Sequence, residues 1–480
     1  MTTLETGRAC AANQRVTSLS VTASTLAGPG TAGAAGCTTR TGARTTHRPG
    51  VPSLGSTAVG RETEGAGVTS TDTPPEIDAA DLSRRVEEFL AEHDPSTTEP
   101  TAFLRARFTA GLAWVHYPAG LGGLGAENGL QTAVDAAFAR ADAPENRPRL
   151  NVIGLGMAAP TILRFGDEAQ QQRWLPPLWT GEEIWCQLFS EPGAGSDLAG
   201  VGTSAVRDGD GWVLNGQKVW TSMAHHARWG ILLARTDPEA PKHRGLSYFV
   251  VDMTAPGVEV RGLRQITGEA EFNEVFLTDV RVPDDQRLGE VGQGWAVAQY
   301  TLMNERVAIG GGTFPRESGA VGPLAARWRE HPEAHTPGLH DRMLRLWVQT
   351  EAARLTAERL GQQQAAGDAG QRSSTRETGQ PGPEGSGVKI TYARLNQECS
   401  SLELELRGED GLRYTDYTER RPEVEDYGSR DAQWRYLRFR ANSIEGGTSE
   451  VLRNVLAERV LGLPPEARAD KDVPWKDLPR

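Results

Sequence analysis

The sequence has few cysteines, no long apolar run and no excess of positive charge. Its four cysteines, Cys10, Cys37, Cys186 and Cys399, show no CxxC or metal-type spacing. We therefore expect neither a disulfide framework nor a metal site, and a reducing, cytoplasmic setting. No segment approaches the roughly 18 apolar residues that span a bilayer. A formal net charge of -12 argues against nucleic acid or an anionic membrane as the partner.

Aromatic residues are missing from the first 75 residues, and the first one in the chain is Phe89. This segment is rich in Thr, Ala, Gly and Ser, so it cannot bury enough apolar surface to offset the cost of ordering its backbone. It also lacks the continuous apolar core of a secretory signal. We expect residues 1–75 to be a disordered extension, or the product of a start codon set too far upstream.

Helical spacing of apolar residues is found on both sides of a central segment. The spacing predicts an N-terminal all-α domain over 76–183 and a C-terminal, four-helix-bundle-like domain over 289–480. The candidate C-terminal helices are 295–310, 338–361, 387–406 and 434–461. Polar, Pro/Gly-rich stretches at 312–337 and 362–387 are expected to be mobile surface loops.

The central segment, 184–288, reads as an antiparallel, barrel-like β domain. Its short runs alternate in period two or are apolar throughout, which is typical of strands. Asp208–Gly211 and Asn215–Gly216 are hairpin-turn signals. The order of helices, sheet and helices predicts an α+β fold with three domains, as the chain length also favours.

Five motifs occur in this framework. They are WVHYPAGLGGLG (114–125), CQLFSEPGAGSDLAG (186–200), LNGQKVWTS (214–222), NERVAIGGG (304–312) and SIEGGTSEVLRNVLAERVLGLP (443–464). Together, in this order, they resemble the signatures of the acyl-CoA dehydrogenase family. The resemblance implies FAD-dependent α,β-dehydrogenation of an acyl-CoA, with hydride passing to flavin N5 and electrons then to an electron-transfer flavoprotein. It also implies a homo- or hetero-oligomer, a dimer or a tetramer.

The same resemblance implies the flavin contacts. A flavin needs polar groups at its N5 and pyrimidine edge and an apolar or aromatic cover over its ring. Phe189 and Ser190, where a strand is expected to end, would supply backbone and hydroxyl contacts to the N5 and O4 edge. Trp220 and Ser222 lie two residues apart on one face of an expected strand, so they could cover the ring and bond its edge. The C-terminal signature retains a further cofactor contact at Thr448 and Glu450.

Removal of the α-proton needs a base, and a carboxylate in a dry pocket suits that task. Much of the family carries this glutamate just before Gly-Thr in the C-terminal signature, where this chain has Gly446, with Glu445 one residue away. A branch that includes isovaleryl-CoA and long-chain enzymes carries it instead on the first C-terminal helix, before an arginine. Glu305-Arg306 matches that position. The resemblance thus implies Glu305 as the base and Glu445 as the reserve candidate.

Three positions are implied beside the substrate. Ser196 resembles the residue that touches the pantetheine-phosphate side of the thioester, Arg306 follows the base, and Gly446 faces the α-carbon. The residues alone leave another interpretation open, because a Glu-Arg pair on an amphipathic helix is commonly a solvated ion pair.

The part of the FAD site that family members draw from a neighbouring subunit departs from the pattern. GGTFPRESGAVG at 311–322 only faintly resembles an Arg-x-x-Phe-Gly-type segment. Glu405 and Glu409 occupy positions of a Gln-x-x-Gly-Gly-type turn, and acidic groups beside a pyrophosphate are unfavourable. Two alternative functions stand beside acyl-CoA dehydrogenation, and the altered half-site favours the second of them. One is a flavin oxidase or monooxygenase acting on a non-CoA substrate, and the other is a non-catalytic subunit of a hetero-oligomeric acyl-CoA dehydrogenase.

Overall fold

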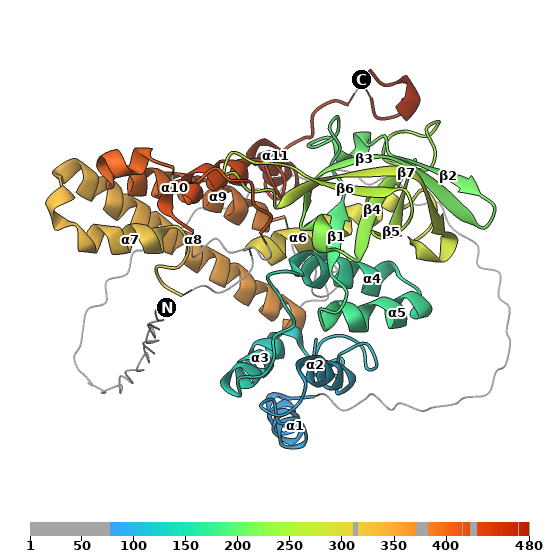
Figure 1. Ribbon diagram of the computed structural model, residues 1–480, viewed down its shortest axis with the longest axis horizontal. Coiled ribbons are helices and arrows are strands. Elements are labelled where there is room, and N and C mark those ends of the chain that lie inside the picture. The colour runs from blue at the N-terminus through green and yellow to red at the C-terminus, as the bar shows by residue number, and fades with distance from the viewer. Residues whose placement is uncertain are drawn as a thin grey trace, which may run out of the picture. The chain divides into compact units, whose positions relative to one another are not determined.

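The structure is a computed structural model that describes residues 77–310, 315–370, 383–414, 416–422, 430–468 and 470–479. Side chains at 306–310 and 364–370 are not described. The described chain passes from helices to a sheet and back to helices (Figure 1). This order confirms the predicted α+β fold. The expectation for residues 1–75 lies outside the described residues.

The first three of the N-terminal helices pack around a small aromatic core, and the next two pack against the sheet. They are α1 (Ala79–Glu92), α2 (Pro100–Thr109), α3 (Gln131–Arg140), α4 (Ala159–Phe165) and α5 (Glu168–Trp179). Asp78 caps α1 by accepting a hydrogen bond from the backbone N–H of Asp81. Phe89, Phe103 and Phe138 pack edge to face with ring centroids 5.3–6.1 Å apart.

The middle domain is one eight-stranded sheet with the strand order β6-β7-β3-β2-β4-β5-β8, to which β1 is added beside β4. The strands are β1 (Trp185–Leu188), β2 (Ser204–Asp208), β3 (Gly211–Ser222), β4 (Trp229–Arg235), β5 (Leu246–Asp252), β6 (Val258–Gly262), β7 (Phe272–Pro283) and β8 (Arg287–Leu288). Pairing is antiparallel except where β1 and β2 meet β4. Every residue of β4 is buried, in keeping with a sequence that is apolar as far as Ala234 and ends in the buried Arg235.

The hairpin predicted at Asn215–Gly216 is wrong, because β3 continues through both residues. The register with β7 shifts between Leu214 and Gly216, and the Asn215 amide exchanges hydrogen bonds with Asp279. A Cβ at Gly216 would lie 2.4 Å from Oγ1 of Thr203. The Asn-Gly pair therefore makes a bulge and a close contact rather than a turn. The hairpin turn predicted at Asp208–Gly211 is confirmed, since β2 and β3 pair in antiparallel fashion and Gly209 has a φ of 62° between them.

The C-terminal region contains α6 (Gly294–Gly310), α7 (Val321–Glu330), α8 (Pro337–Gly370), α9 (Gly385–Glu405), α10 (Ala432–Arg438) and α11 (Ser449–Arg459). Figure 1 shows α6 between the sheet and the other C-terminal helices. It contacts β4 and β5 on one side and α9 on the other. α9 also contacts α7, α8, α10 and α11.

Three boundaries in this region differ from expectation. The stretch 312–337 is not a loop throughout, because Val321, Leu324 and Ala325 bury one face of α7. Helix α8 extends to residue 370 and α9 begins at 385, so the second predicted loop shrinks, and 371–382 lie outside the described residues. The predicted helix 434–461 is broken where Gly446 and Gly447 adopt φ values of 61° and 87°.

None of the helices in the described part of the chain combines the length and apolar character that a bilayer crossing requires.

Candidate active site

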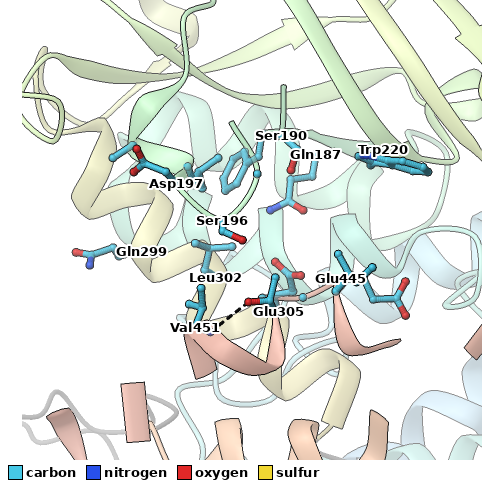
Figure 2. Close-up of a pocket in the computed structure, with 18 of the residues that line it drawn as sticks. Gln187, Ser190, Ser196, Asp197, Trp220, Gln299, Leu302, Glu305, Glu445 and Val451 are labelled. Atoms are coloured by element: carbon cyan, nitrogen blue, oxygen red, sulfur yellow. Dashed lines mark hydrogen bonds between the residues drawn. The ribbon is translucent and has the colours of Figure 1, made fainter. Parts of the chain in front are cut away.

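A cavity of about 2000 Å³ opens between the sheet and the C-terminal helices. This volume exceeds the roughly 300–1,000 Å³ of an ordinary small-molecule site, so it has room for two ligands. Figure 2 shows residues that line it from both sides. We call one side the sheet wall, which comprises Phe189, Ser190, Ser196, Trp220 and Ser222, and the other the helical wall, which comprises Glu305, Glu445, Gly446 and Thr448.

The sheet wall forms where β1 and β3 end. Phe189 and Ser190 follow directly on β1, and Ser196 lies in the turn beyond them. Trp220 has a φ of 61°, and the register with β7 shifts between Lys218 and Thr221. This bulge breaks the simple alternation of side chains, so the indole stays 57% exposed while Thr221 is buried. A non-glycine residue in this conformation is typical of a functional site.

An ion pair between Lys218 and Glu191 holds the backbone of the sheet wall in place. The Lys218 ammonium is fully buried and donates to the carbonyl oxygens of Phe189 and Leu233 at 3.0 and 2.8 Å. It also contacts Oε1 of Glu191 at 2.8 Å. Burial opposes charge on Glu191, but Lys218 and the hydrogen bonds from Thr203 and Gly202 more than offset this and hold the pKa of that carboxyl below its usual range. Lys218 thus fixes the backbone that carries Phe189 and Ser190.

On the helical wall, Glu305 lies near the end of α6 and is half-buried. One turn earlier on α6, the buried Thr301 hydroxyl lies 2.9 Å from that of Thr161 and 3.0 Å from the hydroxyl of Tyr248. Burial raises the pKa of Tyr248, and the nearby Glu305 adds to this effect. These hydroxyl contacts tie α6 to both the N-terminal helices and β5, so they fix the position of Glu305.

Glu445 lies in the same cavity with its carboxylate turned away from Glu305 (Figure 2). Its Oε2 pairs with Arg438 at 2.9 Å, and Asn442 donates a hydrogen bond to its other oxygen. Arg438 also pairs with the buried Glu271 at 3.0 Å. Burial raises the pKa of Glu271, and Arg438 opposes that shift. Glu445 therefore belongs to a buried ion-pair network between the sheet and α10.

Most of the remaining predicted positions can be located. Thr448 lines the cavity and caps α11 by accepting a hydrogen bond from the Val451 N–H at 3.1 Å. Glu450 does not line the cavity, since its side chain is 78% exposed and pairs with Arg453. The side chain of Arg306 lies outside the described residues. Of the two acidic residues that depart from the family pattern, Glu405 pairs with Arg342 at 2.6 Å and Glu409 is exposed.

Three charged residues near the cavity were not predicted from the sequence: Lys218, Arg438 and Lys389. Lys218 lies within the LNGQKVWTS motif, four residues after the buried Leu214. Because alternate residues of a strand face the same side, this spacing could have indicated that Lys218 is buried too. Lys389 is buried on α9, and its ammonium donates to the carbonyl oxygen of Gly447 at 2.7 Å. Single lysines and arginines in helices are ordinarily read as solvated, so local sequence favoured the wrong environment for Lys389 and Arg438.

The sheet wall fits a flavin. The exposed Trp220 indole offers a flat cover, and the Ser190 and Ser222 hydroxyls lie beside it on the cavity lining. Gln265 also lines the cavity, and its side-chain nitrogen is buried without a hydrogen-bond partner among the described residues. A ligand acceptor would satisfy that donor. The positions that a Cβ would occupy at Gly193 and Gly195 meet no atom within 4 Å, which leaves room along the turn.

Comparisons with known proteins agree with this architecture. Residues 80–182, 186–280 and 292–461 match, respectively, the N-terminal, middle and C-terminal domains of acyl-CoA dehydrogenases. The chain is 38% identical over 382 residues to acyl-CoA dehydrogenase IpdE1 of Mycobacterium tuberculosis, covering 78% of this chain and 91% of that protein.

Two further matches extend the comparison. Acyl-CoA dehydrogenase FadE34 of Mycobacterium tuberculosis is 43% identical over 74% of this chain, which spans only 45% of the length of that relative. A solved variant of the Tcur3481-Tcur3483 steroid ACAD superposes with a TM-score of 0.58 at 25% identity, over 81% of this chain and 100% of that one. The chain belongs to the acyl-CoA dehydrogenase family of oxidoreductases.

Proposed function

We propose that this chain catalyses FAD-dependent α,β-dehydrogenation of an acyl-CoA thioester, with Glu305 as the base that removes the α-proton. One observation carries the choice of base. The carboxylate of Glu445, on the same wall, turns away from Glu305 and toward Arg438 and Asn442 (Figure 2). Glu305 instead extends from α6 into the cavity, across from Trp220 and Ser190 (Figure 2).

The proposed chemistry needs a proton acceptor on one side of the acyl chain and a hydride acceptor on the other. Glu305, half-buried, takes the α-proton as its carboxylate becomes a carboxylic acid. FAD, when bound, supplies the acceptor for the β-hydride. Gly446 lies on the same wall as Glu305, and its lack of a side chain leaves space for the α-carbon beside that carboxylate. Arg306 is the second residue of this wall that we propose to contact the substrate.

In this proposal the sheet wall holds the cofactor. Phe189 and Ser190 contact its polar edge, Trp220 covers its ring, and Ser222 adds a hydroxyl. On the helical wall, Thr448 contributes the C-terminal contact, whereas Glu450 faces away from the cavity and is not part of it. On the sheet wall, Ser196 contacts the pantetheine arm of the substrate. Electrons then leave to an electron-transfer flavoprotein, and a second subunit, of the same or another chain, adjoins the cofactor.

A second candidate is a subunit that supports an active partner. The observation that favours it is a group of exposed acidic residues: Glu409 and Asp410 lie on one turn, and Glu405 lies just before it. A pyrophosphate that approached this turn from a neighbouring subunit would meet these carboxylates, two of which pair with arginines, Glu405 with Arg342 and Asp410 with Arg413. The Tcur3481-Tcur3483 steroid ACAD, a similar structure, carries the names of two gene products.

The test is a spectrum of the purified protein followed by anaerobic addition of a panel of short, long, branched and ring-bearing acyl-CoAs. We expect flavin absorbance at about 450 nm that is bleached by at least one of them. A bound flavin that no acyl-CoA reduces, but that NAD(P)H and oxygen turn over, would instead identify an oxidase or monooxygenase. A colourless protein that gains flavin only when co-expressed with a homologous chain would identify the supporting subunit.

A further inference from the structure

Trp475 anchors the C-terminal segment, which we define as residues 470–478, to the sheet side of the cavity. Figure 1 shows the chain returning from α11 to the sheet. The Trp475 indole lies over the guanidinium of Arg235, with Cζ of the arginine 4.4 Å from the ring centroid. Its Nε1 donates a hydrogen bond to the carbonyl oxygen of Gly200 at 3.1 Å. A Cβ at Gly202 would lie 3.5 Å from the same ring, so the indole is seated against this backbone.

Arg235, on which the indole rests, holds two loops that line the cavity. The residue is only 3% exposed. It donates hydrogen bonds to the carbonyl oxygens of Ala199 and Val201 at 2.6 and 3.2 Å, and to that of Lys242 at 3.0 Å. Ala199 and Lys242 each belong to a run of residues on the cavity lining. Trp475 therefore covers the side chain that positions both loops.

Ion pairs and backbone hydrogen bonds fix the segment along the second of these loops. Asp470 pairs with Lys242 at 2.7 Å and Asp472 with Arg244 at 3.5 Å. Two backbone N–H groups of the segment donate to carbonyl oxygens of the same loop at 3.0 and 3.1 Å. Lys471 lies between the two paired aspartates and lines the cavity. Docking of the segment thus places this lysine on the lining.

Two cations at the mouth of the cavity come from this end of the chain. Arg468 and Lys471 are exposed residues of the lining, and neither forms an ion pair within the part of the chain that the structure describes. Two acidic residues of the lining, Asp197 and Asp470, both pair with Lys242, at 3.0 and 2.7 Å. Cations of this kind at the mouth of a site attract anionic groups of a ligand.

We propose that this end of the chain forms part of the substrate site: Arg468 and Lys471 bind the phosphate groups of the acyl-CoA, and Trp475 is the positioning residue that holds them at the mouth of the cavity. This inference rests on the proposed function, in which the acyl end of a CoA thioester reaches Glu305. Coenzyme A carries its phosphates at the end remote from the thioester, so these anions then point toward solvent. Ser196, the proposed contact for the pantetheine arm, lies on the lining between the two ends. Lysine and arginine bind phosphate through charge and hydrogen bonds.

The first test compares single-turnover flavin reduction by the most active acyl-CoA and by the corresponding acyl-pantetheine, which lacks the phosphates. The variants are Trp475→Ala and the double variant Arg468→Gln/Lys471→Gln. In both we expect the apparent dissociation constant for acyl-CoA to rise about tenfold while the limiting rate stays unchanged, because a contact remote from the reacting atoms is lost. Values for acyl-pantetheine should stay within about twofold of wild type. Arg281→Gln is the control, because that exposed arginine pairs with Asp208 outside the cavity lining.

Unfolding midpoints separate a loss of binding from a loss of structure. If Trp475→Ala does not fold, the double variant decides the matter, because Arg468 and Lys471 are exposed and their loss should leave the midpoint unchanged. Trp475→Phe keeps a ring over Arg235 but lacks the N–H donor, so we expect its dissociation constant to lie between those of wild type and Trp475→Ala. An unchanged affinity for acyl-CoA in the folded variants, or an equal loss with acyl-pantetheine, would overturn the inference.

Calorimetric binding of coenzyme A itself distinguishes this inference from the proposed function. If no acyl-CoA reduces the flavin of the wild type, the proposed function fails. Coenzyme A that binds more weakly to the Trp475→Ala and double variants than to the wild type and Arg281→Gln would still support the phosphate contacts. Equal binding to all four proteins, or no binding to any, would overturn the inference as well.

Discussion

The sheet wall is backed by an ion pair whose lysine is fully buried, whereas the helical wall carries two carboxylates on the cavity lining. Lys218 and Glu191 pair behind Phe189 and Ser190. Glu305 and Glu445, in contrast, both line the cavity. The difference suggests a division of labour. The Lys218–Glu191 pair holds the backbone of the sheet wall in shape, and in our proposal the helical wall supplies the base.

Among substitutions on the sheet side, we expect the loss of the buried lysine to lower the free energy of unfolding the most. Lys218→Met removes the buried ammonium and leaves the half-buried Glu191 without its partner, and breaking a buried pair costs about 3–5 kcal/mol. Urea unfolding measures the loss. The matched control is Lys476→Met, which breaks the exposed pair between Lys476 and Glu239 and should change the free energy of unfolding by about 1 kcal/mol or less. A loss of that small size in Lys218→Met would mean that the sheet wall does not depend on this ion pair.

The same pair should make stability depend on pH. The pKa of Glu191 is below its ordinary 4.5 in the folded state, so its contribution is present above that value and is lost as the pH falls through the folded pKa. We expect the stability gap between wild type and Glu191→Gln to be largest near neutral pH and to narrow below about pH 4.5. Urea titrations at constant salt across this range measure it, and a gap that widens on acidification would contradict the assignment.

A smaller effect is expected at the surface of the sheet wall. Trp220→Ala removes an indole that is already 57% exposed, so folding should be little changed while flavin affinity falls roughly tenfold. Trp220→Phe keeps an aromatic face and should stay within a few-fold of wild type. Fluorescence of released flavin measures both. Unchanged retention in Trp220→Ala would show that the indole does not cover the ring.

The same division explains what the sequence could predict. The strands were predictable because their burial is uniform, as in β4 and β5, where apolar character alone indicates the structure. The position of Trp220 on the cavity depends instead on a bulge that period-two alternation cannot anticipate. The break at Gly446 and Gly447 was missed for a similar reason, because helical spacing continues on both sides of it.

The burial of charged residues in the C-terminal helices was harder still to predict from the sequence. The buried face of α9 contains a stripe of small and polar residues at helical spacing, namely Ser386, Lys389, Ala393, Asn396, Ser400 and Glu403. A polar stripe of this kind ordinarily predicts a solvated face. Here it is covered because α9 contacts helices on several sides, which is a property of the tertiary arrangement and not of the local sequence.

The most direct test of the account is the rate of flavin reduction by the best acyl-CoA in Glu305→Gln and Glu445→Gln, measured side by side. Glutamine keeps the shape and hydrogen-bonding capacity of each side chain but removes its basicity. We predict a loss of about 100-fold or more in Glu305→Gln and no more than a few-fold change in Glu445→Gln. A Glu305→Gln rate within a few-fold of wild type, or the larger loss in Glu445→Gln, would contradict the assignment of Glu305 as the base.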